Sequence, residues 1–440
     1  MKVPTTPPDF EDLTVSILAD PSRVLAIFGA VTGPLVSGKY LHWDKVRYHQ
    51  PPGDLSLEEW WYGIKLRRRG QRVPLVDKAG EPFSFGLADP LPETLHRIDL
   101  TTGGSIGMGE GVTNPETRNT YLVRSLVEEA FTSSQLEGAA STRKIADDLI
   151  RGGRAPRDRG ERMILNNYRA MRRIIELKDE PLTERLVFEI HRIVTEDALD
   201  DPTGAGRFRR EDEGGIVVGD EEGNVFHVPP GARQLESRMA ALCDFANDPA
   251  EVPFVHPAIR SMILHFWLAY DHPFIDGNGR TARALFYWSM LRRGYWLFEF
   301  LSISREILES PIKYGRAFLH TETDGNDLTY FLIYHAAIIR KAIDGLIAYL
   351  DRRSGELKSL EQKLRGMGEL NHRQRELIRH ALRHPGSPYT VESHRASHDV
   401  SRQTAANDLA ELADKGLLRK GRAGRELKFV AVPDLERRLM

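Results

Sequence analysis

The sequence predicts a mainly α-helical chain that carries one β-hairpin and ends in a small helix-turn-helix module with a β wing. Three observations support this fold class. Between about Thr117 and Tyr349, apolar residues recur at the three- and four-residue spacing of amphipathic helices. One segment of that stretch, residues 215–228, instead consists of two short β-prone runs around a turn. After residue 370, short helical patterns are followed by two strands around a glycine turn.

The length and composition of the chain predict its number of domains and exclude several classes of site. A chain of 440 residues is expected to hold two or three domains. With 28% charged residues and a net charge of -2, it has no strong overall attraction to nucleic acid or to an anionic membrane. A single cysteine, Cys243, excludes an internal disulfide framework and a multi-cysteine zinc site, and it indicates a cytoplasmic location.

The N-terminal region, residues 1–112, shows little periodicity, and its role is not readable from the sequence. Its most apolar run, residues 24–36, is too short to span a bilayer, so we expect no signal peptide, no transmembrane helix and no membrane partner. Trp60 and Trp61 indicate some packed structure. The glycine-rich stretch 103–111 lacks the GxGxxG spacing and a preceding strand, so we expect a linker there rather than a nucleotide-binding loop.

Residues 113–351 form the main helical domain. The hairpin inside it, with strands at 215–218 and 225–228, is marginally stable alone and is therefore a candidate binding edge. Besides the run that starts near residue 117, the helical patterns cover residues 161–178, 183–198, 233–247, 257–270, 280–293 and 329–349.

Residues 352–370 are charged and lack an apolar face, which predicts a linker or a bridging helix. Residues 371–440 then read as helices at 373–382, 391–397 and 401–413, with strands within 417–430 around a turn at 421–424. This order resembles a winged helix-turn-helix. The module has 14 Lys and Arg residues against nine Asp and Glu residues, a local excess of about five positive charges.

We expect this module to contact DNA, with Arg402 and Gln403 facing base edges from the start of the second helix of the motif. Positive side chains of the wing would contact phosphates; they are Arg419, Lys420, Arg422 and Arg425. A dimerisation or protein-docking module is the alternative.

The most informative segment is the loop 272–283, whose backbone is built to approach a ligand. A helical pattern ends near Tyr270, and Pro273 prevents its simple continuation. Gly277 and Gly279 allow close approach of the backbone to a ligand. A helix starts near Arg280, and such a helix N-terminus favours phosphate binding.

The side chains of this loop supply the charges of a phosphoryl-transfer site. Arg280 and Arg283 add two positive charges on nearly the same helix face. Asp276 offers the single carboxylate typical of a magnesium ion that is held mostly by phosphates and water. His272 is the only group here that accepts a proton near neutral pH. These parts match transfer chemistry that relies on positioning and a base for the attacking hydroxyl.

The loop has two alternative interpretations, a plain turn and a calcium-binding loop. Asp-Gly and Asn-Gly are common turn dipeptides, so each alone would indicate only a turn. A calcium-binding loop counted from Asp276 fails, because its sixth position is Thr281 instead of glycine and its twelfth is Tyr287 instead of glutamate.

The segment His272-Pro-Phe-Ile-Asp-Gly-Asn-Gly-Arg-Thr-Ala-Arg283 resembles the Fic family pattern His-x-Phe-x-acid-Gly-Asn-Gly-Arg-x-x-Arg at every defined position. The resemblance implies a Fic-fold helical bundle that transfers AMP from ATP, with Mg²⁺, to a Ser, Thr or Tyr hydroxyl of a target protein or of itself. The Doc branch, which phosphorylates, replaces the second loop glycine, whereas Gly279 is kept here. The implied roles are His272 as general base, Phe274 as loop anchor, Asp276 as metal ligand, Gly277, Asn278 and Gly279 as the anion pocket, and Arg280 and Arg283 as phosphate ligands.

Residues 133–138 resemble the inhibitory motif of the same family, at the end of a helix expected at about 117–138. The resemblance implies that Glu137, supported by Ser133 and followed by Gly138, reaches Arg283 and occupies the charge that would hold the γ-phosphate. A buried arginine without phosphate needs such an acidic partner. Some relatives use the same glutamate to remove AMP, and that activity stays open here.

The hairpin resembles the target-binding flap of the family, where an extended target segment adds as a strand. The flap positions are Ile216, Val217, Val218, Val225, Phe226 and His227. Downstream, Tyr314, Asp327 and Leu328 match family positions, and Tyr314 is a candidate adenine contact. Relatives often pair, so a homodimer stays open. The alternative function is that of a DNA-binding regulator whose Fic domain senses nucleotide or is silent.

Overall fold

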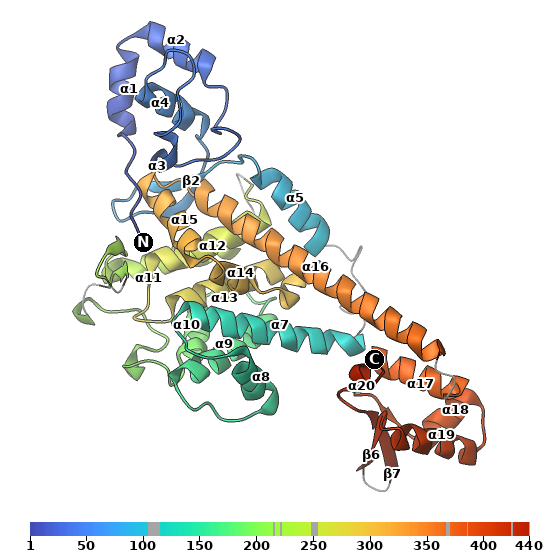
Figure 1. Cartoon of the computed structure of the whole chain (residues 1–440). Helices are drawn as coiled ribbons and strands as arrows, with labels where there is room; N and C mark the ends of the chain where they lie inside the picture. The colour runs from blue at the N-terminus through green and yellow to red at the C-terminus, as the bar shows by residue number, and fades with distance from the viewer. Residues whose placement is uncertain are drawn as a thin grey trace. The chain divides into compact units, whose positions relative to one another are not determined.

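The computed structural model describes residues 1–103, 115–213, 216–220, 222–247, 254–366, 370–384, 386–423 and 426–439 (Figure 1). The chain divides into two compact units. The first comprises residues 1–106 and 124–343, and the second comprises residues 107–123 and 344–440. Two helices, α7 and α16, contribute residues to both units. Most of the expected glycine-rich linker, and Gly215 of the hairpin, lie outside the described residues.

The first unit begins with a small helical cluster that the sequence did not reveal. Trp60 and Trp61 lie in its core, 8% and 1% exposed, so the prediction of packed structure around them is confirmed. A capping box of Ser56 and Glu59 starts the helix that carries both tryptophans. The elements are α1 (Phe10–Leu18), α2 (Pro21–Ala30), α3 (Trp43–Val46), α4 (Leu57–Arg67), the antiparallel strands β1 (Gln71–Val76) and β2 (Pro82–Phe85), and α5 (Leu91–Thr102).

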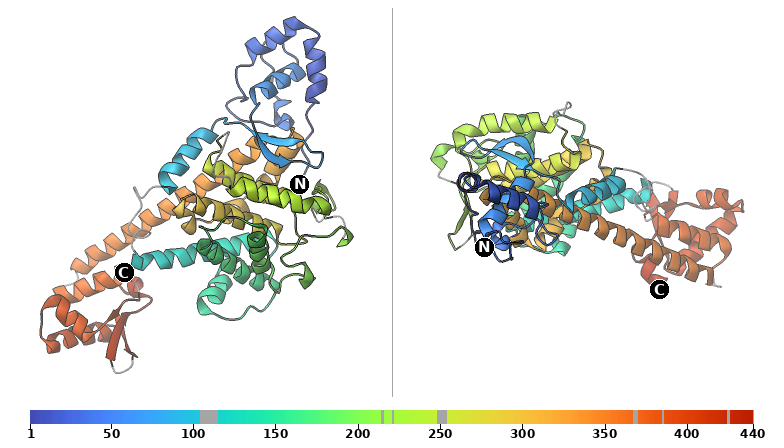
Figure 2. Two further views of the ribbon diagram at one scale, coloured as in Figure 1. Left: turned by 180° about the vertical axis from the view of Figure 1, so that it is seen from behind. Right: turned by 90° about the horizontal axis from the view of Figure 1, so that it is seen from above.

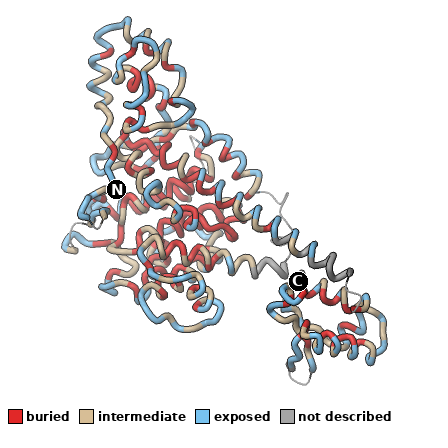
Figure 3. The backbone as a smooth tube through the Cα atoms, in the orientation of Figure 1, coloured by how far each residue is buried: buried red, intermediate tan, exposed pale blue. Residues whose placement is uncertain are grey.

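A helical bundle forms the rest of the first unit, and its centre is the pair α12 and α13 (Figures 1 and 2). Nearly every residue of these two helices is buried, as the red tube in Figure 3 shows. Their apolar side chains pack on all sides, which explains why their amphipathic signal is weak. The helices are α7 (Pro115–Leu136), α8 (Arg143–Gly152), α9 (Arg159–Glu176), α10 (Glu184–Thr195), α11 (Leu235–Asn247), α12 (Pro257–Asp271), α13 (Asn278–Arg292), α14 (Ile303–Leu308), α15 (Pro311–Thr323) and α16 (Thr329–Gly366).

The predicted hairpin is present, but its strands are shorter than expected. β3 (Val218–Gly219) pairs antiparallel with β4 (Val225–His227). Ile216 and Val217, expected in the first strand, lie outside it. The register shifts between Val218 and Gly219, and such an irregularity disrupts the ladder.

The second unit contains the expected helices and strands of the C-terminal module, and α16 continues as a helix through residues 352–366, one of the two forms predicted for that segment. Its apolar core joins the first and third helices of the module to the sheet. Gly424 and Arg425 of the expected wing lie outside the described residues. The elements are α17 (His372–Arg383), β5 (Pro388–Tyr389), α18 (Val391–His398), α19 (Arg402–Asp414), β6 (Leu418–Ala423), β7 (Glu426–Ala431) and α20 (Leu435–Arg438), and the sheet order is β5-β7-β6.

Within the described part of the chain, no single helix is both long and apolar enough to cross a membrane. The pair α1 and α2, bent by 118° at its junction, passes that length and composition test only when taken together.

Candidate active site

The loop between α12 and α13 closes on its own side chains. His272 ends α12 in the left-handed conformation (φ 45°, ψ 56°), and Gly277 precedes α13 with φ 83°. Phe274, expected to anchor the loop, is fully buried. Asn278 Nδ2 donates to the Phe274 carbonyl (2.8 Å), and Asn278 Oδ1 accepts from the Phe274 N–H (2.9 Å). Both polar atoms of the Asn278 amide are therefore used to close the loop. Asn278 can face an anion only through its backbone N–H.

The contacts of His272 define which nitrogen carries its proton. Nδ1 lies 3.3 Å from the Ala269 carbonyl, which can only accept, so Nδ1 holds the proton and Nε2 keeps its lone pair. Burial lowers the pKa of His272 to about 4, so the ring is neutral near pH 7. Neutral Nε2 is thus the one proton acceptor of this imidazole.

Arg209, which no sequence motif singles out, holds the end of α12. Its Nε donates to the His272 carbonyl (2.8 Å), its backbone N–H donates to the Pro273 carbonyl (2.9 Å), and its Nη2 donates to the Pro230 carbonyl. The side chain is 8% exposed. One buried guanidinium therefore connects the segment before the hairpin, the segment after it and the histidine of the loop.

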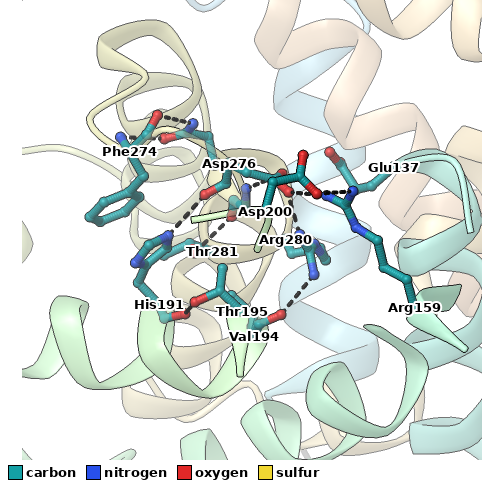
Figure 4. A network of polar contacts seen from close by, with 12 residues as sticks. Glu137, Arg159, His191, Val194, Thr195, Asp200, Phe274, Asp276, Arg280 and Thr281 are labelled. Carbon is teal, nitrogen blue, oxygen red and sulfur yellow. Dashed lines mark hydrogen bonds and ion pairs between the residues drawn. The ribbon is translucent and has the colours of Figure 1, made fainter. Parts of the chain in front are cut away.

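His191 on α10 supports the loop from the other side and was also missed (Figure 4). Its ring stacks on Phe274 with centroids 3.7 Å apart. Nε2 donates to the Asp276 carbonyl (2.9 Å), and Nδ1 accepts from the Gly206 N–H (2.9 Å). Both ring nitrogens are satisfied only in the neutral form, in agreement with burial, which lowers the pKa of His191 to about 4.

Asp276 and Arg280 face each other at the start of α13, but both also have other partners (Figure 4). Arg280 Nη2 lies 3.4 Å from Asp276 Oδ1, while Arg280 Nη1 donates to the Val194 carbonyl (2.7 Å). The Arg280 residue is 1% exposed, so this predicted phosphate ligand is turned into the bundle. Asp276 Oδ2 pairs with Arg159 Nη2 at 3.1 Å.

Arg283 is bound by the end of α7. Glu137 Oε1 lies 2.8 Å from Arg283 Nη2, and Ser133 accepts from Arg283 through its Oγ (2.8 Å) and its carbonyl (3.0 Å). A Cβ added at Gly279 would lie 2.2 Å from Glu137 Oε1, so the Glu137 carboxylate occupies the space above this glycine. Gly138 turns the chain away with φ 87°. Ser133 and Glu137 of the predicted inhibitory motif therefore contact Arg283 directly, and Gly138 provides the turn that follows them.

A cavity of about 420 Å³ lies in front of these groups. His272, Gly279, Glu137 and Arg283 line it, together with Tyr314, whose hydroxyl lies 2.9 Å from His265 Nε2. Burial raises the pKa of Tyr314 to about 12, so it remains protonated.

The hairpin covers one side of this cavity with Val218 and Phe226. His227 is turned toward the bundle, where Nε2 donates to the Tyr270 carbonyl (2.7 Å) and Nδ1 contacts Glu322 Oε2 (2.7 Å). Val217 and Val225 remain about half exposed. His227 thus fastens the hairpin to the body, whereas the two valines stay accessible to a partner.

A buried helix pair joined by a glycine loop thus carries a neutral histidine and two arginines. The profile of the Fic/DOC family matches residues 181–290, and this part of the chain is a Fic domain. It includes α12 and most of α13, hence the whole loop 272–283.

Curated relatives carry the same family name. The protein adenylyltransferase Fic of Nematostella vectensis is 27% identical over 233 residues, which cover 52% of this chain and 49% of that protein. The protein adenylyltransferase Fic of Drosophila willistoni is 36% identical over 114 residues, covering 26% of this chain and 20% of that protein. The chain thus spans half or less of the length of these relatives.

Among solved structures, a Fic family protein from Desulfovibrio desulfuricans G20 superposes with a TM-score of 0.52 at 19% identity, covering 79% of this chain and 97% of that chain. At this identity the likeness supports the fold alone. The prediction of a mainly helical Fic fold is confirmed.

Proposed function

We propose that this chain is a protein adenylyltransferase, which transfers AMP from ATP to a hydroxyl group of a target protein or of itself. The observation that carries the proposal is the neutral His272 beside Arg283 and the glycine-flanked N-terminus of α13, all at one cavity. The names of the relatives support the same activity for this chain.

The proposed reaction breaks one phosphorus–oxygen bond and forms another. The oxygen of the target hydroxyl attacks the α-phosphorus while His272 Nε2 accepts the hydroxyl proton. The bond between the α-phosphorus and the bridging oxygen breaks, and pyrophosphate leaves with that electron pair. The first N–H groups of α13 have no intrahelical acceptors, so they are available to the phosphate oxygens.

The residues present fit a magnesium ion that is held mainly by the nucleotide. Asp276 supplies a hard oxygen ligand and is about one-third exposed. The described residues contain no group of three or more potential metal ligands, which agrees with an ion that keeps its phosphate and water ligands. When bound, Mg²⁺ would neutralise charge that develops on the leaving phosphates.

We further propose that the resting chain is autoinhibited. The 2.8 Å pair of Glu137 and Arg283 supports this, because the carboxylate takes the position in which a γ-phosphate would meet the guanidinium. ATP would then bind without the alignment that in-line attack requires.

Label transfer from α-labelled ATP tests the proposed activity. In a Glu137→Gly background we expect labelled protein, and we expect His272→Ala in that background to lose it. His49→Ala, which changes an exposed histidine outside the site, is the matched control. Equal labelling with and without His272 would contradict the proposed mechanism.

For the second unit we propose a winged helix that binds DNA. Three helices and a three-stranded sheet support the fold, with β5 between the first two helices and β6 and β7 after the third. Arg402 and Gln403 are exposed at the start of α19, and Arg419 and Lys420 are exposed on β6. Binding of the full chain to mixed duplex DNA should fall steeply between low and moderate salt, and Arg402→Ala should weaken it more than Arg437→Ala on α20. Binding that is absent at low salt would favour a protein-docking module.

A further inference from the structure

The Asp276 carboxylate has no free oxygen in this structure. Oδ1 accepts from the Gly277 N–H and lies 3.4 Å from Arg280 Nη2. Oδ2 lies 3.1 Å from Arg159 Nη2. A hard cation binds through carboxylate oxygen, so at Oδ2 it would meet the positive charge of Arg159 and compete with it for the same atom.

Arg159 is the partner that can yield most easily. Oδ1 is held by a backbone N–H and by a guanidinium that is fully buried, whereas the Arg159 side chain is 51% exposed. Arg159 is the first residue of α9, so its side chain extends from a helix end. Its guanidinium can therefore leave without uncovering a buried charge.

A second carboxylate already holds the same guanidinium. Arg159 Nη1 lies 3.0 Å from Asp200 Oδ1, and Figure 4 shows dashed lines from the guanidinium to both carboxylates. The Asp200 side chain is 92% exposed and follows the Arg159 group with little constraint. Release of Arg159 from Asp276 therefore breaks one of its two exposed ion pairs and leaves the pair with Asp200 in place.

We propose that Arg159 is a competitor of the divalent cation: it neutralises Asp276 in the nucleotide-free chain and sets the Mg²⁺ concentration at which nucleotide binds. The inference rests on the proposed function, because it assumes that Asp276 meets the metal of a bound nucleotide. Exposed ion pairs contribute little free energy, so Arg159 raises the Mg²⁺ concentration needed for nucleotide binding only modestly and does not prevent binding.

A phosphate-binding role for Arg159 predicts the opposite result. If its guanidinium held the nucleotide directly, removing it would weaken nucleotide binding at every Mg²⁺ concentration. If it competes with the cation, removing it lowers the Mg²⁺ requirement and leaves no gain when Mg²⁺ is chelated.

The experiment measures the affinity of the full chain for α,β-methylene ATP, whose α–β bond the proposed reaction cannot break, by calorimetry across a series of free Mg²⁺ concentrations. We expect Arg159→Gln to lower the half-saturating Mg²⁺ concentration roughly two- to five-fold, the range of an exposed ion pair. Arg162→Gln is the matched control, because this arginine lies on the same helix and contacts the Asp197 carbonyl instead of Asp276. It removes the same charge without freeing the carboxylate.

Each outcome decides the inference. A half-saturating Mg²⁺ concentration that is unchanged or raised in Arg159→Gln relative to Arg162→Gln overturns the competition, while Mg²⁺-dependent binding that is lost in Asp276→Asn leaves the proposed function standing. Absence of nucleotide binding in every variant, including Glu137→Gly, overturns both. If Arg159→Gln binds the nucleotide more tightly even in EDTA, the competition is also contradicted, because no divalent cation is then present to replace Arg159.

Discussion

Replacing Glu137 is the perturbation whose effect the structure defines best. Glu137→Gly removes the carboxylate 2.8 Å from Arg283 and empties the space above Gly279. Arg283 keeps both hydrogen bonds to Ser133, so it should stay in place with one binding position open. In this variant a phosphate of the nucleotide can take the place of the Glu137 carboxylate at Arg283, while the other contacts of the site remain.

The magnitude follows from the cost of displacing a charged partner. A hydrogen bond to a charged group contributes about 1.5–3 kcal/mol. We take the lower end, because the Glu137 side chain is 26% exposed and water screens the pair. About 1.5 kcal/mol corresponds to roughly a ten-fold change in an equilibrium constant, so we expect about ten-fold more productively bound ATP.

The assay is self-labelling from α-labelled ATP, followed over time and confirmed by intact mass. We expect at least about a ten-fold rise in initial rate for Glu137→Gly. Glu128→Gln is the control, because Glu128 lies on α7 and its ion pair with Arg143 of α8 does not involve the loop. A rate equal to that of the wild type, in protein that still binds ATP, would refute the reasoning.

We expect three further outcomes from substitutions at Gly279, Arg209 and His191. Gly279→Ala should destabilise the fold by about 1–3 kcal/mol in urea unfolding, because its methyl group meets the Glu137 carboxylate, and Glu137→Gly should restore most of that loss. Arg209→Met should cost roughly 2–4 kcal/mol and lower kcat, because it leaves buried carbonyls unpaired, among them that of His272; unchanged kcat would contradict the positioning role. Burial lowers the pKa of His191 to about 4, so the unfolded chain binds the extra proton below about pH 6.5 and stability falls as pH drops toward 4, by up to about 1.4 kcal/mol per pH unit; His191→Gln should reduce that slope in acid titrations of unfolding.

The loop could be predicted from the sequence because its determinants are contiguous. Pro273, Gly277 and the helix start near Arg280 fix the backbone within a few residues, and local rules of conformation apply to them directly. The contact of Glu137 with Arg283 was expected only through the family resemblance, and the structure brings the two groups together.

The supporting residues could not be predicted in the same way. Arg159 and His191 lie on helices far before the loop, and the packing of α9 and α10 against α13 brings them to it. Arg209 lies on the irregular segment before the hairpin and reaches the loop through its own hydrogen bonds. The direction in which a side chain points could not be predicted from the sequence either. Arg280 and His227 carry the expected residue types but turn into the bundle, because carbonyl groups there accept from them.

Part of the N-terminal cluster was readable in principle. Ser56 and Glu59 have the spacing of a capping box, and Asp9 and Asp20 stand where N-caps precede the first two helices. These signals are short and lack a long periodic stretch behind them, which explains why composition alone suggested only a packed region.

The two ion pairs of the site have opposite polarity, and that arrangement constrains how a ligand enters. Arg283, the proposed anion ligand, is held by a protein carboxylate, and Asp276, the proposed cation ligand, is held by a protein guanidinium. On the proposed function, a nucleotide without metal can replace Glu137 but leaves Arg159 on Asp276. A metal ion without nucleotide can replace Arg159 but leaves Glu137 on Arg283. Only the metal–nucleotide complex brings both charges, so the resting site favours ATP with its cation over either component alone.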